Sequence, residues 1–195
     1  AAAARQQAEV HAGEDLELLD SVAAGWIELG QPQRGLALLD GWAQRHQPLA
    51  VADRMVLARN LNRAHREPEL PQAIAQLRAD STLPAADRET LSAWELDSTL
   101  RRADALAEKR SYAQALDLIA ALEKQRPQEQ RLLDEKADIL MASGERERAL
   151  AIRRELLQQH PDDAQLRLDL ARALHKAGRD AQAVAGVREL LEQTP

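Results

Sequence analysis

A period of 34 residues runs through the second half of the sequence and constrains the fold more than any other feature. Prolines, leucines and alanines recur at this step: Pro127, Pro161 and Pro195; Leu106, Leu140 and Leu174; Ala103, Ala137 and Ala171; Ala115, Ala149 and Ala183. Gly144 and Gly178 repeat the same step, and Arg110 stands at the corresponding earlier place. Several independent series with one period indicate that a single structural unit is repeated along the chain.

Each unit has the pattern of two antiparallel helices. In the last unit, apolar residues recur at helical spacing from Leu166 to Leu174 and again from Ala183 to Leu191, with Gly178 between them. This arrangement predicts a helix, a tight turn and a second helix. The recurring alanines let the two helices approach closely, and the closing proline ends the second helix.

The composition excludes the main alternative, a β-sheet. The chain has 38 alanines and 32 leucines in 195 residues, but only 15 valines, isoleucines and threonines together and no phenylalanine. Strands need branched and aromatic side chains to cover a sheet. The sequence therefore predicts an all-α protein.

The unit that begins at Ala164 resembles the tetratricopeptide repeat (TPR), a helix-turn-helix of 34 residues. Its matching places are Leu170, Ala171, Leu174, Gly178, Ala183, Val187, Leu190 and Pro195. The unit beginning at Gln130 matches less well, because Lys136 and Arg153 stand where apolar residues are usual. The segment 111–116 is similar to the opening of the family's second helix. The resemblance implies a right-handed superhelical solenoid of about five TPR-like repeats.

Earlier units are more degenerate, but they extend the array over nearly the whole chain. Residues 1–15 are expected to be the remnant of an upstream repeat, 16–84 two degenerate repeats, and 85–195 a long helix followed by three repeats, all in one continuous solenoid domain. We predict helices at 16–29, 34–46, 50–65, 70–79, 85–109, 111–125, 129–142, 146–159, 163–176 and 180–193.

Two stretches depart from a plain array. Residues 85–109 contain no Gly or Pro, which predicts one long helix. It either packs Leu91 and Trp94 onto the preceding unit or forms a protruding or hinge-like element. At the other stretch, Pro195 closes a unit with no polar capping helix after it. We therefore expect a longer parent array, with Val187, Leu190 and Leu191 partly exposed or covered by a neighbouring molecule.

The sequence offers little for catalysis. It has no cysteine, no Gly-rich phosphate loop, no nucleophile elbow and no histidine pair at metal-ligand spacing. We therefore expect no enzyme activity, no metal and no cofactor. Trp26, Trp42 and Trp94 are predicted to be core residues, with carbohydrate stacking as the alternative for one of them.

A protein partner is the expected ligand, bound in the concave groove that the resemblance implies. The candidate partner-binding residues are Arg59, Asn62, Arg63, Asp104, Glu108, Asp134, Asp138, Arg172, His175 and Lys176. They alternate in sign along the array, as basic, acidic, acidic and again basic groups. The alternative is an ordinary solvated face whose charges pair within the chain. The residues that clamp a peptide carboxylate in some family members are not matched.

Other partners and the location are less constrained. The net charge of −6 excludes a phosphate backbone as the expected partner, so nucleic acid is not predicted. No apolar stretch is long enough for direct insertion into a membrane. The cysteine-free, Ala/Leu/Arg-rich composition resembles the periplasmic TPR segments of bacterial exopolysaccharide export proteins. This resemblance implies an alternative role, in which the segment recruits a polysaccharide-modifying enzyme or contacts the polymer, and it favours the periplasm over the cytoplasm.

Overall fold

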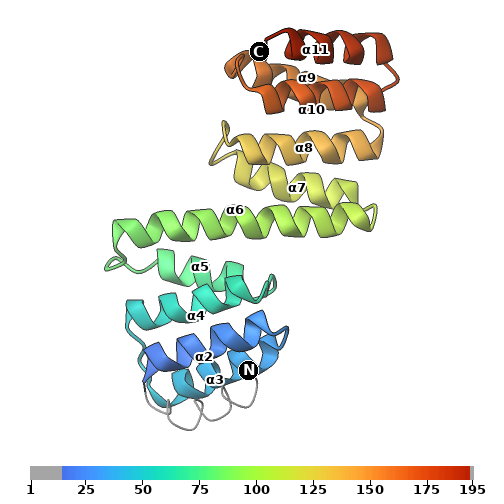
Figure 1. Cartoon of the computed structure of the whole chain (residues 1–195). Helices are drawn as coiled ribbons and strands as arrows, with labels where there is room; N and C mark the ends of the chain where they lie inside the picture. The colour runs from blue at the N-terminus through green and yellow to red at the C-terminus, as the bar shows by residue number, and fades with distance from the viewer. Residues whose placement is uncertain (1–14, 194–195) are drawn as a thin grey trace. The chain divides into compact units, whose positions relative to one another are not determined.

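The structure is a computed structural model that describes residues 15–193, and every regular element in that range is an α-helix (Figure 1). The chain divides into two compact units, residues 1–98 and 99–195. The first unit contains α2 (Leu16–Glu28), α3 (Pro32–Arg45), α4 (Val51–Arg63), α5 (Leu70–Arg78) and the first part of α6 (Ala85–Glu108). The second contains the rest of α6, α7 (Tyr112–Glu123), α8 (Gln130–Ser143), α9 (Arg146–Gln159), α10 (Ala164–Lys176) and α11 (Asp180–Gln193).

All ten predicted helices are present, and their bounds differ from the prediction mainly at the ends. Helix α3 begins at Pro32 rather than at 34, because proline in the first turn lacks only an N–H that has no helical partner there. Helix α4 ends at Arg63 rather than at 65, where His65 takes a positive φ. The upstream remnant predicted for 1–15 lies outside the described residues except for Asp15, the N-cap of α2.

The first helix of every hairpin ends on a left-handed residue. At the end of α8, Gly144 has a φ of 92°, and the N–H of Glu145 donates to the Leu140 carbonyl at 2.8 Å. The first helices of the other hairpins end in the same way: one residue has a positive φ, and the N–H of the next residue donates to a carbonyl in the last turns of the helix. The residues with positive φ are Gly30, His65, Arg110 and Gly178. Glycine adopts this conformation at least cost. Since Arg110 adopts it as well, the turn geometry persists where the glycine of the repeat is lost.

Small residues lie where the two helices of a hairpin touch. In the first unit, Gly35 of α3 is so close to α2 that a Cβ atom there would be 2.6 Å from the Ala23 carbonyl oxygen. Trp42 lies in one cluster with Ala23, and both Trp42 and Trp26 are buried, as predicted for core residues. In the second unit, the repeated alanines are buried as the register predicted: Ala103, Ala115, Ala137, Ala149, Ala171 and Ala183.

The long helix predicted at 85–109 is continuous from Ala85 to Glu108, with no break near Asp97. Its 24 residues span about 36 Å. Leu91 is fully buried against α4 and α5, in a cluster with Leu70, Ile74 and Leu77, and Trp94 packs against the same cluster. The prediction that this helix packs onto the preceding repeat is therefore confirmed.

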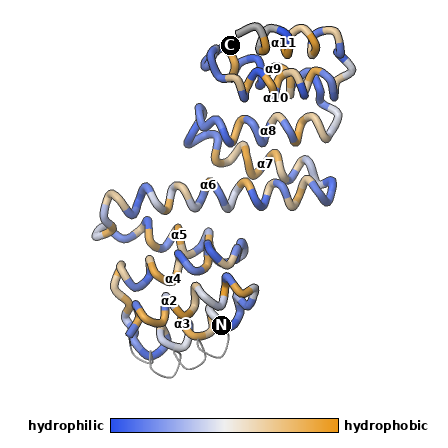
Figure 2. Tube along the Cα trace, viewed as in Figure 1, coloured by the Kyte–Doolittle hydropathy of each residue, from blue (hydrophilic) through white to orange (hydrophobic). Residues whose placement is uncertain are grey.

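Polar residues interrupt the apolar surfaces at defined places in the second unit. Lys136 of α8 stands at a place that is Leu170 one repeat later, and its ammonium lies 2.8 and 2.7 Å from the two carboxylate oxygens of Glu123 on α7. Figure 2 shows hydrophilic and hydrophobic residues mixed along each helix. Among the described residues, no helix has a run of apolar residues that could cross a bilayer.

Candidate binding groove

Helices α8, α9 and α10 of the second unit enclose a charged groove made of two adjoining cavities of about 290 and 350 Å³. We call it the polar groove. Its charged lining consists of Asp134, Asp138, Asp169, Arg146, Arg153, Arg172 and Lys176. Four of these were predicted from the sequence as partner-binding residues: Asp134, Asp138, Arg172 and Lys176. With four cationic and three anionic side chains, the groove has a formal charge near +1.

Arg153 of α9 contacts both of the predicted acidic residues of α8, Asp134 and Asp138. Its guanidinium lies 2.7 Å from an Asp138 oxygen and 3.4 Å from an Asp134 oxygen, while its own side chain is only 8% exposed. Burial raises the pKa of Asp134, and the charge of Arg153 opposes that effect. A buried cation needs such partners, because removing it from water is costly. Arg153 therefore offsets one of the two negative charges of the acidic pair seen in the sequence.

The cations at the mouth of the polar groove are more accessible than its floor. Arg172 is exposed and contacts Asp169 one turn earlier on α10 at 3.1 Å. Lys176, one turn later, is also exposed and lines both cavities. Asp138, whose side chain is 58% exposed, also lies at the mouth of the groove. Arg146, which lines the second cavity, is exposed as well. The groove thus presents three cations and the carboxylate of Asp138 to solvent, around the buried guanidinium of Arg153.

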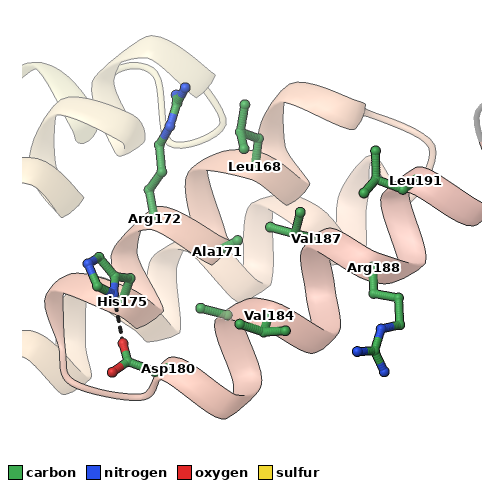
Figure 3. A pocket seen from close by; sticks show the side chains of 10 residues that line it. Leu168, Ala171, Arg172, His175, Asp180, Val184, Val187, Arg188 and Leu191 are labelled. Atoms are coloured by element: carbon green, nitrogen blue, oxygen red, sulfur yellow. Dashed lines mark hydrogen bonds and ion pairs between the residues drawn. The ribbon is translucent and has the colours of Figure 1, made fainter.

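His175 lies away from this groove, although it was predicted to belong to the same surface. Its Nδ1 is 2.7 Å from an Asp180 oxygen, across the turn between α10 and α11 (Figure 3). Both side chains are exposed, so the contact adds little stability. His175 instead lines a second, apolar cavity between α10 and α11.

Asp104 of the predicted acidic pair on α6 lies near Glu135 of α8, a carboxyl group whose pKa is raised. Asp104 and Glu108 are both exposed, and Asp104 shares a hydrogen bond with Glu135. Desolvation of Glu135, the charge of Asp104 and the shared hydrogen bond, with a smaller contribution from Asp138, raise the pKa of Glu135 to about 7. The sequence pattern identified the pair but not the third carboxyl group.

The predicted cations of the first unit meet an acid from α2. Arg59 lies 2.6 Å and Arg63 3.4 Å from the carboxylate of Asp20. Asn60, which is fully buried, donates to the same carboxylate at 2.6 Å. Asn62 is half-buried on the same helix. These contacts tie α4 to α2, so part of the predicted basic surface serves to hold two repeats together.

Sequence reasoning missed Arg153, Asp169 and Asn60 as members of these clusters. For Arg153 a signal was present, because a charged residue replaced the apolar residue usual at that place of the repeat. A buried charge in a helical array requires a partner, and the acids of the neighbouring helix are the candidates for it.

Among the described residues, no group of three or more His, Cys, Asp or Glu is placed to hold a metal ion.

Comparison with known proteins places this fold. Residues 140–195 match the family model of the tetratricopeptide repeat. The structure is similar to MamA (residues 41 to the end) from Desulfovibrio magneticus RS-1, with 14% identity, a TM-score of 0.56, and coverage of 94% of this chain and 99% of that one. A search of curated proteins found no match.

A second set of solved structures has the same architecture. The nearly identical TPR-like repeats of a Podosopora anserina protein described as a kinesin light chain are 19% identical, with a TM-score of 0.53 and coverage of 92% of this chain and 97% of that one. Another structure of those repeats, from a single-substitution variant, gives 18% identity and a TM-score of 0.55, with coverage of 93% and 95%.

The fold is therefore that of an all-α helical-repeat solenoid. The resemblance to the TPR family drawn from the sequence is confirmed, on the matched segment 140–195 and on the architecture of the described helices.

Proposed function

We propose that the protein is a non-catalytic scaffold that binds a partner protein through the polar groove of its second unit. The observation that carries this proposal is the groove itself, in which exposed Arg172 and Lys176 stand beside a carboxylate fixed by a buried arginine. Proteins with TPR folds are generally scaffolds for protein partners, which supports a binding role over catalysis.

The charges that line the groove support one kind of partner chemistry. Two adjoining cavities of about 290 and 350 Å³ are large enough to accept side chains of a peptide segment. Arg172 and Lys176 lie one turn apart on α10, so they can contact neighbouring carboxylates of the partner. Asp138 lies beside them and accepts a hydrogen bond from an amide or a cation. The partner segment is therefore mainly acidic, with one donor group.

Reversal of charge tests this proposal. Ligand segments are selected from a library of short peptides that vary in charge, and affinities are measured by calorimetry at several salt concentrations. We expect Arg172→Glu with Lys176→Glu to weaken binding at least tenfold and to reduce its salt dependence. Lys109→Glu with Lys124→Glu is the matched control, because it changes the same charge at exposed lysines of the same unit.

The contrary result is also defined. If the groove variant keeps its helical content and binds the selected peptides with unchanged affinity and salt slope, the polar groove is not the binding site. The alternative role in exopolysaccharide export has no structural observation in its favour and stays a prediction of the sequence.

A further inference from the structure

Two apolar cavities lie among the last helices of the second unit. One, of about 660 Å³, lies between α10 and α11 and shares Arg172 with the polar groove. Val187 and Leu191 line it and are 36% and 69% exposed, which confirms the exposure predicted for them, while the side chain of Leu190 lies outside the described residues. A further repeat of the longer array that the sequence predicts would cover this surface, so its exposure identifies no partner. The other cavity has a different origin.

The second cavity has a volume of about 620 Å³ and is lined by α9, α10 and α11. We call it the α9–α11 groove and define it by Arg154, Leu157, Arg167, Leu170, Leu174 and Gly186. Helices α9 and α11 both pack on α10, so the groove runs between them over α10. Its lining has no residue in common with either cavity of the polar groove.

The α9–α11 groove is open because one apolar side chain of the repeat is missing. One repeat earlier, Ile152 packs against a buried cluster that consists of Ala137, Leu140 and Ala149. Gly186 replaces Ile152 in the last repeat, although the cluster itself recurs as Ala171, Leu174 and Ala183. A Cβ atom at Gly186 would meet no neighbouring atom within 4 Å. The groove therefore has room for a side chain that this repeat does not supply.

A helix that follows in the chain does not close a cavity of this kind. The first unit has one of about 480 Å³, lined by α3, α4 and α5. On α4 it is lined by an arginine and two leucines at the same spacing as those of α10 in the α9–α11 groove: Arg54, Leu57 and Leu61. This cavity is open although α6 follows α5 and packs on it through Leu91. The α9–α11 groove is therefore expected to stay open in a longer array.

The charge of the α9–α11 groove distinguishes it from the cavity of the first unit. Arg154 and Arg167 are half-buried in it, and among the described residues that line it none is acidic. In the first unit, Asp40 holds the place of Arg154, ten residues after the turn glycine, and Arg54 forms an ion pair with Asp80. A carboxylate is therefore complementary to the α9–α11 groove and not to the first-unit cavity.

Two exposed glutamines indicate what kind of molecule carries that carboxylate. Gln158 of α9 and Gln182 of α11 line the groove from opposite helices. A primary amide both donates and accepts hydrogen bonds, and a peptide main chain offers both kinds of partner along its length. A simple alkyl carboxylate offers neither away from its charged end. The lining therefore favours an extended peptide segment as the occupant.

We propose that the α9–α11 groove binds an extended segment of a partner protein, in which one bulky apolar residue has an acidic residue two places away on each side. Side chains alternate along an extended backbone, so these three point to the same side. The apolar side chain enters the space beside Gly186, and the carboxylates contact Arg154 and Arg167. The site adds a binding activity that does not depend on the polar groove.

Acetylated and amidated heptapeptides of the form Ser-X-Ser-Z-Ser-X-Ser are the probes, where X is Glu, Gln or Lys and Z is Leu, Phe or Ser. Each peptide is titrated into the isotope-labelled 195-residue chain, and the shifts of the backbone amide resonances give both the affinity and the place of binding. We expect shifts in α9, α10 and α11 around Gly186. Peptides with Glu at X and Leu or Phe at Z should bind at least tenfold more tightly than peptides with Lys at X or Ser at Z.

Two substitutions of one residue separate filling of the groove from a change in the fold. Gly186→Ile restores the side chain of the preceding repeat and should reduce affinity at least tenfold. Gly186→Ala is the matched control, because it also removes a glycine from the interior of α11 but leaves most of the space open, so affinity should change less than threefold. Both should raise Tm, since glycine is unfavourable inside a helix.

A second pair of variants tests the charge. Arg154→Gln should weaken binding of the peptides with Glu at X at least threefold, because it removes one of the two cations of the groove. Arg188→Gln is the control, since Arg188 is an exposed arginine of α11 outside the groove, and it should leave that affinity unchanged.

The proposal is wrong if no peptide shifts the amides of the α9–α11 groove, if Gly186→Ile binds the peptides as tightly as the original chain, or if peptides with Glu and Lys at X bind equally well. Sodium hexanoate is titrated in the same way. If it binds at the same amides as tightly as the best peptide, the groove is a site for small alkyl anions and not for a peptide. Loss of peptide binding in Arg172→Glu with Lys176→Glu, which leaves the α9–α11 groove unchanged, would place the peptides in the polar groove and also overturn the proposal.

Discussion

Substitution of Glu135 by glutamine should stabilise the protein above neutral pH and leave it unchanged in mild acid. The folded protein holds the pKa of Glu135 at about 7, against an ordinary value of 4.5, because the group is desolvated and faces Asp104. Between these two values the folded chain binds more protons than the unfolded chain. The free energy of unfolding that depends on this group is therefore complete below pH 4.5 and falls as the pH rises through 7.

The magnitude follows from that difference in pKa. At about 1.36 kcal/mol for each pKa unit, the upper limit is about 3.4 kcal/mol. Glu135 is only half-buried, so solvent screens much of the repulsion, and about 1–2 kcal/mol is expected. Since glutamine cannot ionise, Glu135→Gln should raise the free energy of unfolding by this amount at about pH 8.5. For a chain of this size, the rise in Tm is about 2–8 °C.

Thermal unfolding followed by circular dichroism at about pH 5 and about pH 8.5 measures the effect, since these values lie on either side of the folded-state pKa. Glu108→Gln is the matched control, because it removes the same charge from an exposed place one turn after Asp104. Equal Tm changes for Glu135→Gln at both pH values would refute the reasoning. The same conclusion would follow if Glu108→Gln reproduced the whole increase, because a general decrease in acidic repulsion would then account for it.

Three further changes test the packing. Arg153→Ala should lower the free energy of unfolding by about 2–3 kcal/mol in urea titrations, since it leaves two carboxylates without their buried partner; an unchanged midpoint would show that the ion pairs contribute nothing. Gly35→Ala should destabilise the protein by about 1–3 kcal/mol, because the added Cβ would lie 2.6 Å from a carbonyl oxygen. Gly41→Ala should stabilise it by about 0.5–1 kcal/mol, because the nearest contact of its Cβ would be at 3.7 Å and alanine favours the helix. Changes of the same sign for both would contradict the close approach at Gly35. Ala149→Leu and Ala171→Leu should each lower the free energy of unfolding by about 1–3 kcal/mol, and an unchanged Tm in both would mean that the helices do not touch there.

The fold could be predicted because its main determinants are local and repeated. The period fixes the length of each hairpin, and the alanines at 149, 171 and 183 mark where helices touch. Both features are read without knowing any long-range contact. The same reasoning located α6, because a stretch without Gly or Pro between two turn signals has few alternatives to one helix.

The site could be predicted only in part, because charged contacts depend on side chains from different helices. The repeat pattern assigned Asp134 and Asp138 to one surface, but it could not show that Arg153 of α9 reaches both of them. Likewise, the pKa of Glu135 depends on how closely α8 brings it to Asp104, which lies on another helix far earlier in the sequence. Long side chains reach several neighbours, and sequence spacing does not select among them.

The ion pair between Glu123 and Lys136 limits which repeats of this array are interchangeable. The stability of a helical array is approximately a sum of the stabilities of its repeats and of the interfaces between neighbours, so a repeat can replace another without loss only where the junctions have the same chemistry. Here the junction between α7 and α8 carries Glu123 and Lys136, whereas the equivalent places on α9 and α10 are Leu157 and Leu170. Deletion of residues 130–163 would keep the period but set Glu123 against Leu170, leaving a partly buried carboxylate without its cation. An exchange of repeats at this junction would therefore cost stability even when it preserves every helix.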